Sequence, residues 1–396
     1  MRLPLLPILI VLVLGIVTDI YIYRRLRVNH TPRGLCVTYV VLSVLCQLML
    51  AAAICLPKRQ GDDSMLQTLM WMLFAYFSVY LPKYIYALLS LAGRLCERIS
   101  HRRVRWPGIA GAVIGAAVFV LMWHGALVGR YSTEVKEVEI AVEGLPAAFD
   151  GYRIVQISDL HTGSYAGDTA YLASLVDTVN GLGADVIVFT GDLVNRRSRE
   201  LYPYMTTLSR MHAPGGVWSV MGNHDYGDYY TWPDEASHLA DADSLKAMQG
   251  RMGWRMLNNS HTWLRRGTDS VALIGVENIG DPPFRVYGDL GRAYPDRDDD
   301  NVKILLTHNP QHWVDSISAS ESGRIALTLS GHTHAMQMEL LGLSPAAWRY
   351  PTWGGLYADS LGRHLYVNIG IGEVALPARI GQARPEVTVL TLRRKQ

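Results

Sequence analysis

The sequence predicts two structural parts, an all-α membrane region of about four transmembrane helices and an α/β domain after it. The chain has 396 residues, more than one ordinary hydrophobic core usually organises. Hydrophobic residues make up 49% of the chain and charged residues only 18%, and the apolar excess lies in residues 1–128. After residue 128, short apolar runs alternate with helical patterns, which is typical of layered α/β domains.

Four segments in the N-terminal third are long and apolar enough to cross a bilayer, which takes about 20 residues. These segments are 3–23, 35–56, 65–92 and 107–128. The first segment has only Arg2 before it and no small-residue cleavage site after it, so we expect a retained anchor and not a signal peptide.

The loops between these segments predict their orientation, because loops rich in arginine and lysine stay in the cytoplasm. Arginines cluster after the first segment and after the third, whereas the charges of the middle loop balance. Four crossings then place the domain after residue 128 outside the cytoplasm. If the third segment, which contains Pro82 and Lys83, does not span, the domain faces the cytoplasm. Lys83 itself either faces a partner or a lipid headgroup, or extends along a tilted helix to the interface.

Charge and cysteine content exclude several classes of site. The near-balanced net charge of +2 gives no indication of a nucleic-acid-binding surface. All four cysteines precede residue 97, so the second part has neither a disulfide framework nor a thiolate zinc site.

The elements predicted for the second part begin with strand 153–158, helix 167–182 behind Asp168 as N-cap, strand 185–190, helix 201–211 and strand 216–221. The later apolar runs have no long helices between them and predict a second sheet packed on the first. These runs are 255–257, 262–265, 270–276, 302–306, 325–330, 364–369 and 386–392. Segments 226–241 and 280–300 are expected to be long loops.

Five short polar clusters stand at predicted strand ends. They are Asp159-Leu160-His161, Gly191-Asp192, Gly222-Asn223-His224-Asp225, Thr307-His308 and Gly331-His332-Thr333-His334. Asp159 and His161 are two residues apart, so their side chains point the same way, and His332 and His334 repeat that spacing. The glycines before the polar residues allow tight turns and a close approach of the backbone.

A single pair of this kind is more often structural than functional, and a chain with 13 histidines contains some close pairs by chance. Five clusters in sequence, each at a strand end, instead predict a metal site at the edge where open α/β sheets bind ligands. The other histidines are expected in surface or packing positions. They are His30, His101, His124, His212, His238, His261, His312 and His364.

The series of motifs resembles the calcineurin-like metallophosphoesterase superfamily, whose pattern is D-x-H, G-D, G-N-H-D/E, a lone H and G-H-x-H. The resemblance covers about residues 150–396, and the tail Ala378-Arg379-Ile380-Gly381 with Arg384-Pro385-Glu386 is similar to a membrane-anchored bacterial branch. It implies a sandwich of two mixed sheets flanked by helices. The expected division is a transmembrane region in 1–128, a linker with the first strand in 129–150, and the phosphoesterase domain in 151–396.

The resemblance also implies a role for each polar residue. One ion would be held by Asp159, His161, Asp192 and His334. The second would be held by Asp192, Asn223, His308 and His332, with Asp192 bridging the two ions. His224 would lie over the phosphate, and Asp225 would orient its imidazole. Oxygen and nitrogen ligands suit two divalent ions of manganese, iron or zinc.

One departure from the branch pattern stands beside these ligands. Members of that branch often read G-H-T-H-G-G-Q, whereas this chain has Ala335 and Met336 in place of the last two glycines. The change removes backbone freedom and predicts a narrower or more apolar mouth.

The predicted function is a multi-pass, membrane-anchored phosphoesterase that hydrolyses a phosphomonoester or phosphodiester with a metal-activated hydroxide. Its partners are the membrane and a phosphoester, with a lipid or envelope-linked substrate as one candidate. The alternatives are a cytoplasm-facing enzyme resembling the UDP-diacylglucosamine pyrophosphohydrolases and a non-catalytic membrane scaffold.

Two groups of aromatic residues allow two interpretations. Either they contact acyl chains and the membrane interface, or they pack a lid over the sheets. The residues are Tyr226, Tyr229, Tyr230, Trp232, Trp348 and Trp353.

Overall fold

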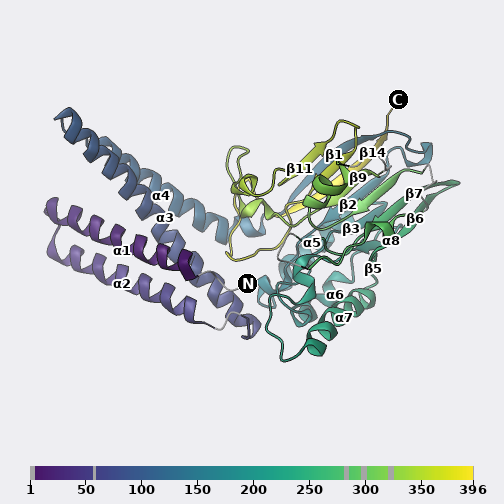
Figure 1. Ribbon diagram of the computed structural model, residues 1–396, viewed down its shortest axis with the longest axis horizontal. Coiled ribbons are helices and arrows are strands. Elements are labelled where there is room, and N and C mark those ends of the chain that lie inside the picture. The colour runs from purple at the N-terminus through teal and green to yellow at the C-terminus, as the bar shows by residue number, and fades with distance from the viewer. Residues whose placement is uncertain (1–4, 57–58, 281–284, 296–300, 320–324, 396) are drawn as a thin grey trace. The chain divides into compact units, whose positions relative to one another are not determined.

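The computed structural model describes residues 5–56, 59–280, 285–295, 301–319 and 325–395 of the chain (Figure 1). The chain divides into two compact units. The N-terminal unit consists of residues 1–127 and 375–378, and the C-terminal unit consists of residues 128–374 and 379–396. The predicted division at residues 128 and 150 stays a prediction.

The described residues of the N-terminal unit form four helices. They are α1 (Leu5–Val28), α2 (Arg33–Cys55), α3 (Asp63–Ser100) and α4 (Trp106–Leu127). Within the described residues, α2, α3 and the helical stretch that begins with α4 are long and apolar enough to cross a membrane, and α1 is not in that set. The predicted helical membrane region is therefore confirmed as four helices with three apolar spans.

The third helix is longer than the predicted segment 65–92. It begins behind Asp62, whose side chain accepts a hydrogen bond from the amide of Met65, and it continues for 38 residues through Pro82. Arg94 and Arg98, predicted to lie in a loop, belong to the last turns of this helix.

A polar cluster joins three helices of the N-terminal unit. The Lys83 ammonium lies 2.9 Å from Asp19 Oδ1 and 2.9 Å from Ser43 Oγ. Tyr39 and Tyr80 donate hydrogen bonds to Asp19 over 2.8 and 2.6 Å. Ser43 is ten residues after the start of α2, about 15 Å along it, which is half of a hydrocarbon layer of about 30 Å. Of the interpretations of Lys83, the structure favours a half-buried charge that faces a partner.

We expect the substitution Lys83→Met to lower the stability of the N-terminal unit by about 3 kcal/mol, because it leaves the half-buried Asp19 carboxylate without a cation. The double variant Asp19→Leu/Lys83→Met should recover most of this loss, since no unpaired charge remains. Tyr80→Phe removes one hydrogen bond to Asp19 and should cost only about 1 kcal/mol. Thermal unfolding of the full-length variants in detergent measures these differences, and a double variant as unstable as Lys83→Met would contradict the pairing.

The C-terminal unit contains two six-stranded sheets. The first consists, in spatial order, of β1 (Glu134–Val142), β14 (Glu386–Arg394), β2 (Arg153–Ile157), β3 (Val186–Phe189), β4 (Val217–Ser219) and β5 (Arg255–Met256). The second consists of β11 (Gly355–Ala358), β12 (His364–Val367), β9 (Ile325–Ser330), β8 (Lys303–Leu306), β7 (Asp269–Gly275) and β6 (Ser260–Arg266). Parallel and antiparallel pairs occur in both sheets, so the predicted pair of mixed sheets is confirmed.

Both faces of the central strands β2 and β3 of the first sheet are buried. Ile154 and Val188 pack with Leu306 of the second sheet in the core between the sheets. The next residue of β2, Val155, points to the opposite face and packs with Leu172 of α5 (Ala170–Gly181). Successive side chains of a strand point to opposite faces, so the residues of a run such as 153–158 pack alternately into two hydrophobic cores.

The helices of this unit differ in part from the predicted ones. They are α5 (Ala170–Gly181), α6 (Met205–Leu208), α7 (Glu235–Arg251) and α8 (Leu290–Ala293). Helix 201–211 is replaced by the 3-10 helix η4 (Ser198–Tyr204) and the short α6. The loop predicted at 226–241 is wrong in its second half, because Asp234 caps α7 by accepting a hydrogen bond from the amide of Ser237. Part of the loop predicted at 280–300 lies outside the described residues.

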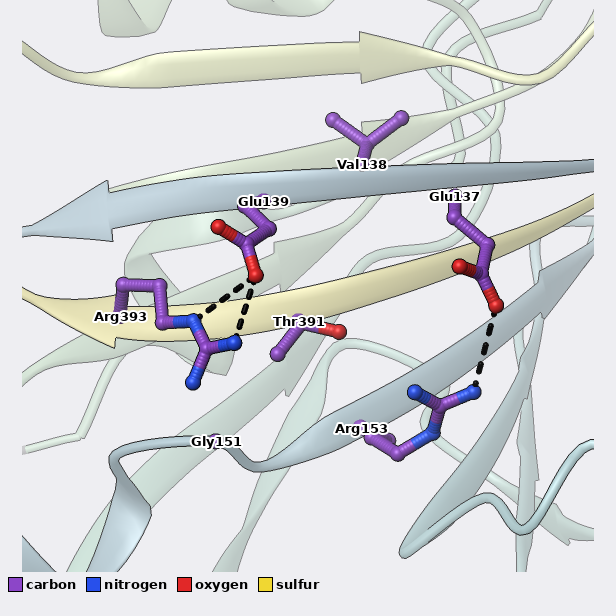
Figure 2. Close-up of a pocket in the computed structure, with 7 residues that line it drawn as sticks. All are labelled: Glu137, Val138, Glu139, Gly151, Arg153, Thr391 and Arg393. Carbon is purple, nitrogen blue, oxygen red and sulfur yellow. Dashed lines mark hydrogen bonds and ion pairs between the residues drawn. The ribbon is translucent and has the colours of Figure 1, made fainter.

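A shallow hollow of about 430 Å³ lies on the surface of β1, β14 and β2 (Figure 2). Figure 2 shows two ion pairs across it, Glu139 with Arg393 at 2.6 Å and Glu137 with Arg153 at 3.6 Å. Such exposed pairs contribute little to stability. The hollow contains none of the predicted site residues.

Candidate metal centre

Two groups of buried or half-buried side chains converge where strands of both sheets end. One group is Asp159, His161 and His334, and the other is Asp192, His308 and His332. Within each group the possible ligand atoms all lie within 4.8 Å of one another. Asp159 follows β2, Asp192 follows β3, His308 follows β8 and His332 follows β9, so the predicted placement at strand ends holds for both sheets.

Asp192 belongs to the second group and also lies close to the first. Its Oδ2 atom is 3.2 Å from His308 Nε2 in one group and 3.5 Å from His161 Nε2 in the other. Asn223, which follows β4, brings its Oδ1 atom to 3.0 Å from His308 Nε2. The structure therefore brings together all seven residues that the resemblance implies as ligands.

The donor set fits metal cations. His161 Nε2 and His334 Nε2 are 3.0 Å apart, and His332 Nδ1 and His308 Nε2 are 3.1 Å apart, so ring nitrogens face each other in a buried space. Burial, and then the neighbouring His308, lowers the pKa of His332 to about 3, which keeps its imidazole neutral and a lone pair available. Burial lowers the pKa of His308, but the Asp192 carboxylate outweighs it and raises that pKa to about 9. The buried Asp192 carboxylate is thus stabilised by a positive charge beside it, which a metal ion would supply.

The backbone around these residues is strained. Asp159, His161, Asp192, His332 and His334 all have φ between 42 and 78°, in the left-handed region that residues with a side chain rarely adopt. Such conformations cost about 1–3 kcal/mol each and persist where the surroundings enforce them, which is typical of functional sites.

Two glycines make room for the carboxylates. A Cβ atom on Gly222 would collide with the carboxylate of Asp192, and a Cβ on Gly331 would collide with that of Asp159. The predicted close approach of the backbone at these two positions is confirmed.

His224 lies beside the two groups, and three contacts fix its ring. Its Nδ1 atom is 2.6 Å from the carbonyl oxygen of Asn195, so Nδ1 carries the proton of this bond and Nε2 stays available. The ring stacks on Tyr229 at 4.0 Å, and the backbone amide donates to Asp192 Oδ1 over 2.8 Å. Burial lowers the pKa of His224, which favours the neutral ring.

Asp225 has a different role from the predicted one. Its carboxylate accepts hydrogen bonds from four backbone amides, those of Asp192, Leu193, Val194 and Gly222, over 2.7–3.2 Å. The prediction that Asp225 orients the His224 imidazole is wrong, because the carbonyl of Asn195 does so. Asp225 instead fixes the loop of Asp192 against the turn that carries Asn223 and His224. Burial, with the charge of Asp192, raises the pKa of Asp225 to about 7, and the amide donors act in the opposite direction.

Three side chains of the site were not predicted as part of it. Tyr350 brings its hydroxyl to 2.9 Å from His332 Nε2. Arg379 is buried, and its Nη2 atom lies 3.2 Å from His334 Nδ1. Tyr229 accepts a hydrogen bond from Asn223 Nδ2 over 2.8 Å and covers His224, which favours the lid interpretation for this residue. Two of the three had a sequence signal: Arg379 stands in the tail that resembles the bacterial branch, and Tyr229 belongs to an aromatic group.

His312, predicted in a packing role, is buried and brings Nδ1 to 3.1 Å from Thr307 Oγ1. Burial lowers the pKa of His312 to about 4, partly offset by Asp315, whereas an unfolded histidine titrates near 6.5. Its contribution to stability is therefore complete above about pH 6.5 and is lost as the pH falls toward 4. The loss at pH 5 is on the order of 2 kcal/mol.

We therefore expect the thermal midpoint of the full-length protein to fall less between pH 7.5 and pH 5 in His312→Gln than in the parent chain. His212→Gln, at an exposed position, is the matched control and should leave the pH dependence unchanged. Equal falls in the His312→Gln variant and the parent chain would refute the role of His312.

Comparison with known proteins decides the family. A family model described as "Calcineurin-like phosphoesterase" matches residues 152–336, and one described as "Probable Calcineurin-like phosphoesterase, transmembrane domain" matches residues 1–130. The metallophosphoesterase YkuE of Bacillus subtilis is 30% identical over 305 residues, which are 74% of this chain and 97% of YkuE. The chain belongs to the calcineurin-like phosphoesterase family. It is thus a member of a family of metal-dependent hydrolases and a multi-pass membrane protein with a transmembrane N-terminal domain.

Two further relatives extend this picture. The metallophosphoesterase Cj0846 of Campylobacter jejuni is 25% identical over 405 residues, with 98% of both chains covered. A "Transmembrane protein with metallophosphoesterase domain" of Danio rerio is 32% identical over 280 residues, which are 69% of this calcineurin-like phosphoesterase. The match spans 60% of the length of the Danio rerio relative.

Proposed function

We propose that this chain hydrolyses a phosphomonoester or phosphodiester at a centre of two divalent ions. The position of Asp192 carries the proposal, because its carboxylate lies within 3.5 Å of a histidine nitrogen from each group. Asp159, His161, Asp192 and His334 would hold one ion, and Asp192, Asn223, His308 and His332 the other. The oxygen and nitrogen donors suit manganese, iron or zinc.

Two ions held there would supply a hydroxide near neutral pH and charge that stabilises the phosphoryl oxygens. The residues of the chain would do the rest. Asn195 keeps the proton of His224 on Nδ1, so Nε2 is free to hold or transfer a proton at the phosphoester. Tyr229 and the amide of His224 fix the ring against Asp192, and Asp225 fixes the loop of Asp192, so little reorganisation accompanies the reaction.

The catalytic domain is proposed to face outside the cytoplasm. The continuous course of α3 through Pro82 supports its crossing of the membrane, on which the predicted orientation depends. With the arginine-rich loops inside, crossings by α2, α3 and α4 alone lead the chain outside, whether or not α1 spans. Alkaline phosphatase fused after Gln396 should then be active and β-galactosidase inactive. The reverse result would favour a cytoplasm-facing enzyme of lipid metabolism.

The test of the function uses the full-length protein in detergent, stripped of metal and reloaded with Mn²⁺. We expect hydrolysis of bis-p-nitrophenyl phosphate together with about two ions bound per chain. Bound metal without hydrolysis of this diester would leave monoester hydrolysis, tested with p-nitrophenyl phosphate. If the protein neither binds metal nor hydrolyses either ester, the proposal is refuted in favour of a membrane scaffold.

A further inference from the structure

A short segment beside the candidate metal centre exposes a group of large apolar side chains to solvent. We call this group the apolar rim; its members are Met336, Leu340, Leu341, Leu343 and Trp348. Leu341 is 95% exposed, Leu343 76% and Trp348 91%. Isolated exposed apolar residues are ordinary, but a contiguous group marks a surface that another apolar phase covers.

The exposure is built into the backbone of the rim. Leu340 and Leu343 exchange two backbone hydrogen bonds of 2.9 and 3.0 Å, which close a tight turn with Leu341 in the left-handed region. Ser344 then donates to the carbonyl of Ala335 over 2.6 Å and caps the 3-10 helix η8 (Pro345–Trp348). These hydrogen bonds hold the turn in a conformation that leaves its leucines exposed.

The rim and the candidate ligands belong to one stretch of chain. Met336 is two residues after His334, and both Ala335 and Met336 have left-handed φ values of 51 and 46°. Two residues after Trp348, Tyr350 contacts His332 over 2.9 Å. Thr333 donates to the carbonyl of Trp353 over 2.5 Å, which ties the end of the stretch to its beginning. A molecule that covers the rim thus contacts the stretch of chain that carries His332 and His334.

The chemistry of the stretch favours a lipid leaflet as its partner. Residues 335–350 contain only two charged residues, Glu339 and Arg349. Tryptophan beside arginine, next to exposed leucines, is typical of surfaces at the boundary of headgroups and acyl chains. Only residues 128 and 129 separate the end of α4 from Arg130, whose side chain is buried in the C-terminal unit against Glu373 at 2.8 Å. The unit therefore begins within reach of the membrane surface.

We propose that the apolar rim enters a lipid leaflet and delivers to the metal centre a phosphoester that is carried on an acyl or alkyl chain. This substrate class rests on the proposed phosphoesterase function. Ala335 and Met336 stand where the branch pattern often has two glycines. Met336 therefore adds an apolar side chain to the rim where glycine would present only backbone.

The first test measures membrane contact without activity. In the full-length protein with Cys36, Cys46, Cys55 and Cys96 replaced by alanine, Leu343→Cys carries an environment-sensitive nitrobenzoxadiazole label. In phosphatidylcholine vesicles we expect a blue-shifted emission that doxyl-labelled phosphatidylcholine quenches. The control is Leu239→Cys on α7, which is 56% exposed and outside the rim, and its label should stay unquenched. A label at 343 that is unquenched, or that responds only to a second copy of the chain, would overturn the proposal.

The second test separates the rim from the function itself. The probes are p-nitrophenyl ethyl phosphate and p-nitrophenyl dodecyl phosphate, which share the reaction and the chromophore. For the protein in vesicles, Leu341→Ser/Leu343→Ser/Trp348→Ser should lower kcat/KM for the dodecyl ester at least tenfold and leave the ethyl ester within twofold. Equal effects on both esters, or none, would overturn the rim as a substrate surface. No hydrolysis of either ester by the parent chain would refute the diesterase function, while the quenching experiment would still judge membrane contact.

Discussion

Replacing Asp192 by asparagine is expected to lower hydrolysis of bis-p-nitrophenyl phosphate at least about a thousandfold and to reduce bound metal from two ions per chain to one or none. Asparagine keeps the shape of the side chain and an oxygen that can still accept the amide of His224. It removes the negative charge that lies between His161 and His308. The effect is therefore one of charge and not of packing.

The measurement combines steady-state hydrolysis with metal content by mass spectrometry on the full-length protein. Asp177→Asn is the matched control, because it makes the same change at an exposed carboxylate of α5 that pairs with Arg210 on the surface. That variant should keep two ions and the activity of the parent chain. An Asp192→Asn protein that retains both ions and its activity would rule out a bridging role.

The substitution His224→Ala should lower kcat by about 10²–10⁴-fold and leave the metal content at two ions per chain. His224 has the geometry of a proton-holding group, with Nδ1 bound to the Asn195 carbonyl and Nε2 left for the substrate. It stands outside both groups of candidate ligands, so the ions should stay when it is removed. The distinction between loss of rate and loss of metal separates its role from that of Asp192.

Tyr229→Phe is the companion variant. It keeps the aromatic ring that stacks on His224 and removes only the hydroxyl that accepts from Asn223. We expect a change of less than about tenfold, because the imidazole keeps its other contacts. If His224→Ala instead loses an ion, His224 is a ligand and the assignment of the second group must be revised.

The strand-end ligands could be predicted from the sequence because their placement is local. A side chain directly after a buried strand emerges at the edge of the sheet, and residues two apart point the same way. Asp159 with His161, Asp192, and His332 with His334 needed no knowledge of distant contacts for that placement. The membrane helices were equally predictable, since their length and apolar composition reflect the thickness of the bilayer.

Partners that are far apart in the sequence were decided only by the tertiary structure. Asp225 follows His224 directly, yet its carboxylate bonds to amides some 30 residues earlier, because the loop after β3 packs against the turn after β4. Tyr229 and Trp348 were equally plausible as membrane contacts. In the structure, half-buried Tyr229 stacks on His224, whereas Trp348 is exposed.

In the N-terminal unit, too, the partner of a conspicuous residue was decided only by the tertiary structure. Lys83 stood out in the sequence, whereas its partner Asp19 lies 64 residues earlier and meets it only when α1 packs on α3. The sequence by itself determined which chemical groups stand at the sheet edges and which segments form long apolar helices, because both follow from local periodicity and composition. The pairing of those groups required the packed chain, since hydrogen bonds and ion pairs form between whatever surfaces the hydrophobic cores bring together.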